Sequence, residues 1–357
     1  MDTQPYKRLA EHLDALPQGF PSTEDGAELR LLQKIFTPEQ AELAAQLRVT
    51  LETPAELAER LGRDKRELRN TLKEMARNGL IRIGKAESGL GFGALPFVVG
   101  IYEFQLGRID AEMAQLFEDY YQAAFGSALS MQPQVHRVLP VNETVRNDME
   151  VRPHESAAEI VRSAQAWGVQ DCICRVQKEL IDDPCSHPKD VCMVLSNQPG
   201  IFDHSDQVQA QTLDEALATL QRAADAGLVH SVSNSKDVWY VCNCCTCSCG
   251  ILRGMAELGM ANVVARSAFV NQVDEALCVG CGTCLDYCQF AALTLIDVCE
   301  VNSMRCVGCG VCVPICPEDA MTLVRRPEDE ILAVPETETD WMQLRAESRG
   351  LDLGEVM

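Results

Sequence analysis

Apolar side chains recur at helical intervals through the first part of the chain. This spacing predicts a helix over residues 27–48 and another over residues 64–78. A shorter helix is expected over residues 53–62, because a threonine–proline pair begins it and a glycine ends it. Two short apolar runs around a glycine-rich turn, within residues 80–99, predict a hairpin. The predicted order is helix, helix, helix, hairpin.

Farther along the chain, helical and extended patterns alternate. Residues 109–125 predict a helix whose aromatic positions are best explained by packing in the core or between subunits. Residues 212–232 predict an amphipathic helix followed by a strand, and residues 239–242 predict a second strand. A mixture of helices and strands in one region indicates the α+β class.

The N-terminal order of three helices and a hairpin is typical of a winged helix-turn-helix. On the third helix, four basic side chains fall within an arc of about 80°, at roughly 100° per residue. They are Arg66, Arg69, Lys73 and Arg77. Acidic residues on the same helix reduce its positive charge, so a solvated helix face is the favoured interpretation and DNA binding is not expected. Such modules also serve dimerisation, which makes this region a candidate homo-oligomer contact.

Charge divides the chain. The net charge of −22 over 357 residues argues against general nucleic-acid binding. Residues 1–95 carry a net charge of −1, residues 96–260 carry −11, and residues 261–357 carry −10. All 18 cysteines lie at or beyond Cys172, within the acidic part. A near-neutral module therefore precedes an acidic region that holds every thiol.

The N-terminal sequence has no apolar core of a secretory signal, and the longest apolar run, residues 94–101, is too short for a membrane span. We therefore expect a cytoplasmic protein with no membrane span. Cysteines stay reduced in the cytoplasm, so clustered thiols there indicate metal ligands and not disulfides.

The strongest motif is a cysteine run that occurs twice, as CVGCGTCLDYCQ and, 28 residues later, as CVGCGVCVPICP. Two-residue spacers let three thiolates surround one face of an iron–sulfur cube, and the fourth ligand comes from the other half of the repeat. The first cluster would then take Cys278, Cys281, Cys284 and Cys316. The second would take Cys306, Cys309, Cys312 and Cys288.

Over residues 270–327 this repeat resembles the bacterial two-[4Fe–4S] ferredoxins. One departure stands beside a predicted ligand: the proline that follows the fourth cysteine is present as Pro317 but replaced by Gln289 in the first half. Every predicted ligand is intact. The resemblance implies two [4Fe–4S] clusters, with a local change of backbone next to Cys288.

A second constellation of nine cysteines lies upstream and points to further metal. Its members are Cys172, Cys174, Cys185, Cys192, Cys242, Cys244, Cys245, Cys247 and Cys249. Because side chains alternate along an extended chain, Cys242 and Cys244 would face one way and Cys245, Cys247 and Cys249 the other. We expect two ligand sets, completed by Cys172 with Cys174 and by Cys185 with Cys192. A single cubane, a larger cluster and one zinc site remain open alternatives.

Three residues near these cysteines have ordinary interpretations. His187 is expected to be a polar loop residue more often than a ligand. Arg175 would either neutralise cluster charge or cap the helix that follows it. Cys299, between the two halves of the repeat, is expected to be a buried apolar side chain.

The whole arrangement is similar to a family of iron–sulfur proteins of anaerobic bacteria. The likeness is carried by the GFP and DGAEL segments within residues 19–29, by PFVVGIYEFQ at residues 96–105, and by the CICR and CNCCTCSC elements. It spans roughly residues 8–326 and includes the winged-helix-like and ferredoxin regions. The resemblance implies a redox protein in anaerobic electron metabolism.

These observations predict an α+β protein in five segments. Residues 1–105 form a winged-helix-like domain, 106–150 a helical connector, and 151–260 a cysteine-rich α+β iron–sulfur domain. Residues 261–327 form a two-[4Fe–4S] ferredoxin domain, and 328–357 an acidic tail. In the tail, Trp341, Met342 and Leu344 suggest either a partner anchor or a partly disordered end.

Clusters held entirely by thiolates suit one-electron transfer better than substrate chemistry. We expect an electron-transfer protein or subunit that serves an oxidoreductase or flavoprotein partner, with two [4Fe–4S] clusters and one or two central clusters. The alternative is a redox-sensing transcription regulator that uses the winged helix. Catalysis at the central cysteines is a third hypothesis, and no catalytic residue is assigned.

Overall fold

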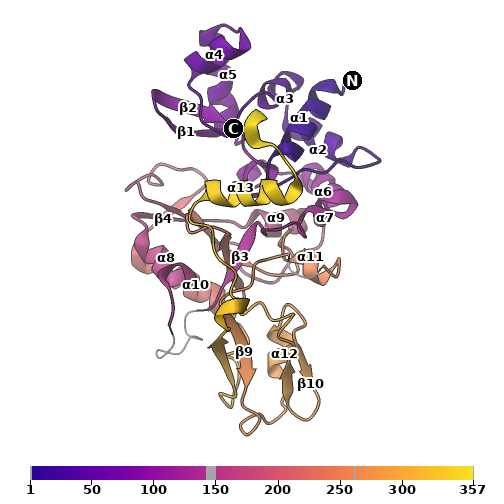
Figure 1. Ribbon diagram of the computed structural model, residues 1–357, viewed down its shortest axis with the longest axis vertical. Coiled ribbons are helices and arrows are strands. Elements are labelled where there is room, and N and C mark those ends of the chain that lie inside the picture. The colour runs from indigo at the N-terminus through magenta and orange to yellow at the C-terminus, as the bar shows by residue number, and fades with distance from the viewer. Residues whose placement is uncertain (1, 142–149, 261–262, 357) are drawn as a thin grey trace. The chain divides into compact units, whose positions relative to one another are not determined.

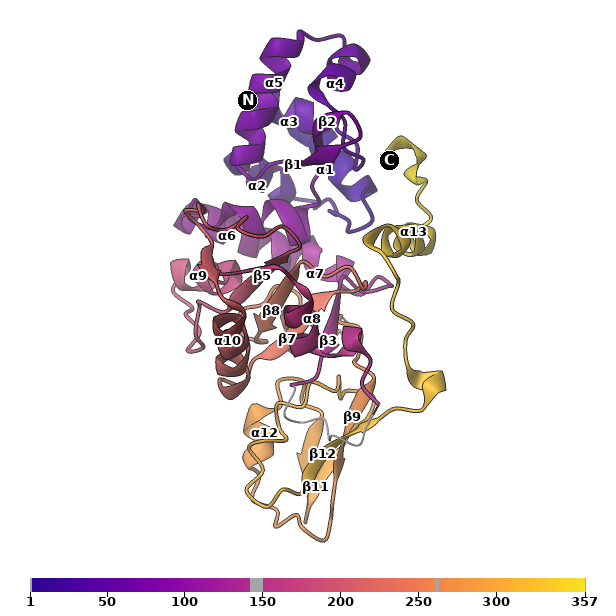
Figure 2. The same ribbon diagram turned by 90° about the vertical axis from the view of Figure 1, so that its left-hand side faces the viewer.

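The computed structural model describes residues 2–141, 150–260 and 263–356 (Figures 1 and 2). The chain divides into two compact units, residues 1–128 with 342–357, and residues 129–341. Both helices and strands are present, which confirms the α+β class. This division into two units is coarser than the five predicted segments, whose boundaries remain a prediction.

The first unit begins with five helices and a hairpin. They are α1 (Gln4–Ala15), α2 (Ala27–Ile35), α3 (Pro38–Ala44), α4 (Pro54–Leu61), α5 (Lys65–Arg77), β1 (Arg82–Ala86) and β2 (Gly89–Gly93). The single helix expected over residues 27–48 is wrong: it is two helices. Thr37 caps α3 by accepting from the Gln40 N–H, and Pro38 at the first position of α3 cannot continue α2.

Residues 97–128 of the first unit contribute an aromatic core. Short helical turns η1 (Phe97–Ile101) and η2 (Glu103–Gln105) lead to α6 (Ala111–Tyr120), η3 (Tyr121–Phe125) and α7 (Gly126–Ala128). Tyr102 stacks on Phe117 with ring centroids 3.9 Å apart. Phe117, Tyr120, Tyr121 and Phe125 are all buried. This confirms that the aromatic positions serve core packing.

The second unit is built around a six-stranded antiparallel sheet with the order β3-β7-β8-β5-β4-β6. Its strands are β3 (His136–Leu139), β4 (Ala166–Gln170), β5 (Cys192–Ser196), β6 (Gln209–Gln211), β7 (Val229–Ser233) and β8 (Tyr240–Cys244). Helices α8 (Ala157–Ser163) and α10 (Leu213–Asp225) pack on it around Val161, Leu220 and Val241 (Figure 2). Helix α9 (Ile173–Leu180) and α11 (Arg253–Ala256) flank the cysteine-rich segments.

The cysteine repeat forms a pair of two-stranded ladders in the same unit. Strand β9 (Phe269–Val273) pairs with β12 (Met321–Arg325), and β10 (Leu293–Leu295) pairs with β11 (Cys299–Val301) (Figure 1). Helix α12 (Thr283–Tyr287) carries part of the first cysteine run. The first run therefore lies between β9 and β10, and the second between β11 and β12. Each half of the repeat presents its cysteines from the segment between two strands, and in the first half this segment includes α12.

The C-terminal segment is ordered. After the turn η6 (Glu328–Glu330), α13 (Glu338–Arg349) and the turn η7 (Leu353–Glu355) complete the chain. Trp341 is buried and donates its indole N–H to the Gln134 carbonyl over 2.9 Å, and Met342 is also buried. Of the three expected anchor residues only Leu344 is exposed. Trp341 and Met342 therefore serve the chain's own packing. Among the described helices, none is long and apolar enough to cross a membrane.

Candidate metal centres

Four cysteines of the repeat surround one cavity. They are Cys278, Cys281, Cys284 and Cys316, and the cavity wall is completed mainly by glycine and apolar residues. Burial raises the pKa of Cys284, and the thiols of Cys281 and Cys316 raise it further. A bound cation would offset these effects on Cys284 and favour the thiolate form of the ligands. The residues therefore fit the first of the two predicted clusters.

The other four cysteines of the repeat influence one another electrostatically. Burial raises the pKa of Cys309 to about 12, and the thiols of Cys306 and Cys288 add to the rise. Burial also raises the pKa of Cys312, again with contributions from the three neighbouring thiols. Thiols from both halves of the repeat thus meet here, as the second predicted cluster requires.

Backbone and side-chain N–H groups point at these sulfurs. The Ala292 N–H donates to Cys288 Sγ and the Ala320 N–H donates to Cys316 Sγ, both over 3.3 Å. These alanines occupy equivalent positions of the repeat. The Asn271 amide adds a donor to Cys312 Sγ over 3.1 Å. Such bonds stabilise negative charge on a ligand sulfur and raise a cluster's reduction potential.

The turns of the cysteine runs favour glycine. Gly280, Gly282, Gly308 and Gly310 all have φ between 67° and 79°. At Gly308 an added Cβ would lie 2.0 Å from the Phe269 carbonyl oxygen, so a side chain is excluded there by space as well as by conformation. The same left-handed turn recurs in both halves because both halves wrap the chain in the same way.

Cys299 lies closer to this site than the sequence suggested. It is buried, which confirms the expectation, and it also lines the first cavity. Its Sγ is 3.6 Å from Cys284 Sγ, and its N–H donates to Cys278 Sγ over 3.4 Å. Burial, followed by Cys284, raises its pKa to about 12. A thiol that stays protonated there is a neutral neighbour of the proposed ligands.

The nine central cysteines separate into groups of six and three. The six are Cys172, Cys174, Cys192, Cys242, Cys244 and Cys249. Cys242 and Cys244 share one face of β8 and interact with each other, and Cys242 also reaches Cys192 at the start of β5. Cys172, at the N-terminal end of α9, interacts with Cys174 in the first turn of that helix. We call this group the six-cysteine pocket.

Arg175 supplies positive charge to the six-cysteine pocket. It is 1% exposed, and its Nη2 donates to the Asn243 carbonyl over 2.9 Å and to Cys245 Sγ over 3.4 Å. Burial alone would lower its pKa, but the thiols of Cys172, Cys245 and Cys244 raise it. Its Nε and Nη1 find no acceptor among the described residues. Inorganic sulfide would satisfy these buried donors, so the pocket fits an iron–sulfur cluster.

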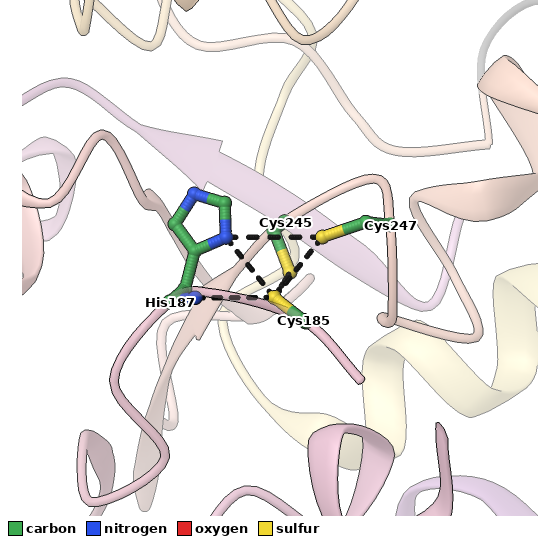
Figure 3. Close-up of side chains that lie close together, drawn as sticks. All are labelled: Cys185, His187, Cys245 and Cys247. Carbon is green, nitrogen blue, oxygen red and sulfur yellow. Dashed lines mark hydrogen bonds between the residues drawn. The ribbon is translucent and has the colours of Figure 1, made fainter. Parts of the chain in front are cut away.

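The remaining three cysteines meet His187 (Figure 3). Cys185 Sγ lies 3.0 Å from His187 Nδ1, 3.1 Å from Cys247 Sγ and 3.6 Å from Cys245 Sγ. All four donor atoms lie within 4.8 Å of one another. Interaction with Cys245 raises the pKa of His187. The sequence favoured an ordinary loop histidine at this position, whereas the structure places its ring nitrogen among three thiols.

Cys249 is separated from Cys245 and Cys247, with which the strand alternation had grouped it. Strand β8 ends at Cys244, and the chain then turns so that the Cys249 N–H donates to the Cys245 carbonyl over 3.0 Å. Alternation does not apply in a turn, and Cys249 instead interacts with Cys174 and Cys244. Cys192 likewise lies in the six-cysteine pocket and not beside Cys185.

Comparison with known proteins bears on the C-terminal part. Residues 277–320 match the family model described as the 4Fe-4S dicluster domain, and this range contains all eight cysteines of the repeat. The chain carries a 4Fe-4S dicluster domain. No curated protein and no solved structure matches the chain. The match confirms a ferredoxin-type domain and supports iron–sulfur electron transfer in general. The resemblance over the rest of the chain stays a prediction.

One side chain of the dicluster domain binds the central cysteine segment. Gln289 accepts the Thr246 N–H over 2.7 Å and donates to the Gly227 carbonyl over 2.5 Å. Thr246 lies between Cys245 and Cys247, and Gln289 directly follows Cys288. The sequence marked Gln289 only as a departure from proline. The structure gives a reason for it, because proline offers neither the acceptor nor the donor.

Proposed function

We propose that this chain is an electron-transfer protein or subunit that relays single electrons through several [4Fe–4S] clusters to or from an oxidoreductase or flavoprotein partner. The observation that carries the proposal is the contact of Gln289 with the Thr246 backbone. It joins the residue after Cys288, a predicted cluster ligand, to Thr246, which lies two residues after Cys244 of the six-cysteine pocket. A short bonded path between two metal regions suits electron relay.

The proposed ligands follow the geometry. Cys278, Cys281, Cys284 and Cys316 hold the first cluster, and their shared cavity supports this set. Cys306, Cys309, Cys312 and Cys288 hold the second, supported by the mutual effect of these thiols. A third cluster lies in the six-cysteine pocket, where Arg175 offers unpartnered donors. When bound, these clusters supply reversible one-electron chemistry, and thiolate ligation leaves them no open substrate position.

The exit of the relay is the first cluster. Cys281 is exposed, and around the cavity Val279 is 65% exposed. Residues 261–357 carry a net charge of −10. A partner with a basic rim would be steered toward such a surface. The surface near the first cluster therefore combines an exposed cluster ligand, Cys281, with negative charge that attracts a basic partner.

The first unit serves protein contact in this proposal. We infer a winged-helix-like module from α4, α5 and the β1–β2 hairpin, and α5 exposes Glu67 and Glu74 beside Arg66 and Arg69. A face of mixed charge suits a protein partner or a second copy of this chain better than DNA. Reduced thiols and several clusters suit the cytoplasm of an anaerobic cell.

Anaerobic purification followed by iron and acid-labile sulfide analysis tests the relay. We expect about twelve irons per chain, about eight from the dicluster domain and about four from the six-cysteine pocket. Cys174→Ser should lose about four irons, whereas the matched control Cys299→Ser should keep them all. Electrons loaded at low potential should pass to a one-electron acceptor. Full occupancy without any such transfer would contradict the proposed function.

A further inference from the structure

We propose that Cys185, His187, Cys245 and Cys247 bind one zinc ion, separate from the clusters of the relay. The site goes beyond the proposed function, because zinc has no redox chemistry and carries no electrons. It would divide the central cysteines between two kinds of metal. The six-cysteine pocket keeps the iron–sulfur cluster, and the three other thiols with His187 form a mononuclear site.

The distances between donor atoms favour one ion. Zinc bonds of about 2.3 Å to sulfur and about 2.0–2.1 Å to nitrogen set tetrahedral edges of roughly 3.5–3.8 Å. Separations of 3.0, 3.1, 3.6 and 3.8 Å between pairs of the four donors approach these edges. A cubane would hold its ligand sulfurs much farther apart, because each ligand binds a different iron at a separate corner. Four donors within 4.8 Å leave no room for a cubane between them.

The donor set agrees with the distances. Three thiolates and one imidazole form a common closed, tetrahedral zinc site, whereas [4Fe–4S] clusters are held by cysteines. Figure 3 shows the His187 ring and the three sulfurs converging on one point. Cys245 is buried, Cys185 and His187 are half-buried, and only Cys247 is exposed. A site closed by protein on most sides suits a structural ion and not a catalytic one.

The site joins two loops at neighbouring ends of β5 and β8, which pair with each other. Cys185 and His187 lie in the loop between α9 and β5, and Cys245 and Cys247 lie in the turn after β8. Thr246, between the last two, donates to Gln289 of the dicluster domain. A zinc ion here would hold the turn in the conformation that Gln289 binds. Its role is therefore to position the contact between two metal regions.

Metal analysis of the anaerobically purified full chain tests the proposal. We expect one zinc per chain, with an X-ray absorption spectrum at the zinc edge that shows three sulfurs and one nitrogen. His187→Ala and Cys247→Ser should lose at least nine-tenths of the zinc and keep the iron content of the wild type. His187→Cys should retain zinc with four sulfurs, which separates loss of a ligand from failure to fold.

The matched control is His204→Ala, an exposed histidine outside the site, which should leave zinc unchanged. Iron in place of zinc, or zinc that persists in both His187→Ala and Cys247→Ser, would overturn the proposal. So would a loss of about four irons in either variant, since this would mean that the four residues hold a cluster. These outcomes are independent of electron transfer by the dicluster domain, which is measured separately.

Discussion

At the scale of single residues, two polar side chains make hydrogen bonds at or beside the proposed cluster ligands. Gln289 makes two hydrogen bonds to the central segment, and Asn271 makes one to Cys312. Both are polar side chains that contact a ligand or the backbone beside one. Each can be removed without touching a proposed ligand, so each offers a test that leaves the metal sites in place.

We expect Gln289→Pro to slow electron transfer between the central cluster and the dicluster domain. The substitution gives position 289 the residue that stands at the equivalent position of the second half, Pro317. It removes both hydrogen bonds, which together are worth about 1–3 kcal/mol. Rapid-mixing spectroscopy of the partly reduced protein measures the rate. The exposed Gln272→Ala is the control. An unchanged rate with full iron content would show that the contact plays no part in the relay.

Asn271→Leu should lower the potential of the cluster that Cys312 is proposed to bind. The lost N–H···S bond stabilises the more negative, reduced state, so its removal favours oxidation. A bond of about 0.5–1.5 kcal/mol corresponds to roughly 20–65 mV for one electron. A redox titration followed by electron paramagnetic resonance measures the shift. The first cluster is the internal reference, and equal shifts of both clusters would contradict the assignment.

At the scale of elements, the turns around the cysteines restrict the sequence most, because they need particular backbone conformations. The loops of the repeat turn at glycines with positive φ, and β8 ends where the chain must turn to place Cys245 and Cys249 in different groups. Capping residues likewise set where helices begin. Thr37 and Pro38 start α3, and so divide residues 27–48 into two helices where the apolar pattern predicted one. Local signals thus set where elements stop.

Gly308→Ala should lose the second cluster, and Gly282→Ala should keep the first. Both positions have positive φ, at 70° and 79°, so both substitutions carry a conformational cost of about 1–2 kcal/mol. Only at Gly308 would the new Cβ meet a backbone oxygen, at 2.0 Å, whereas at Gly282 its nearest neighbour is a leucine methyl at 3.6 Å. Iron analysis distinguishes them. Equal losses of iron from the two variants would show that the positive φ, and not the space around the new Cβ, determines cluster loss.

Much of the element order was predictable from periodicity and capping. The three N-terminal helix regions, the hairpin and the helix–strand unit at residues 213–233 all appear where apolar spacing and turn residues indicated. The prediction failed where periodicity continued across a break, at Thr37 and Pro38. It also failed for the C-terminal segment, because burial of Trp341 against Gln134 depends on residues more than 200 positions away.

At the scale of the whole molecule, all the proposed metal ligands lie in one unit. The 18 cysteines, from Cys172 to Cys316, fall within residues 129–341, and the first unit has none. Metal binding by a folded site adds to the stability of the unit that contains it. The first unit has its own aromatic core and needs no metal to bury it.

Removal of all metal by a chelator under reducing conditions should therefore unfold the second unit locally and spare the first. Hydrogen exchange of the intact chain measures this, because peptides report on each unit separately. We expect amides around β8 and in the repeat to lose protection, with amides of α2 and α6 unchanged. Equal loss of protection in both units would show that they fold as one cooperative body.

The sequence by itself determined the dicluster domain, because the ligand spacing of an iron–sulfur cube is local and survives any arrangement of the rest of the chain. It also predicted that the central thiols bind metal, because nine cysteines lie within 78 residues and are expected to be reduced. Only the tertiary structure decided how those thiols divide. The turn after Cys244 breaks the strand alternation, and the fold brings Cys185 and His187 beside residues about 60 positions away. Distances between segments so remote in sequence follow from packing, which no local pattern records.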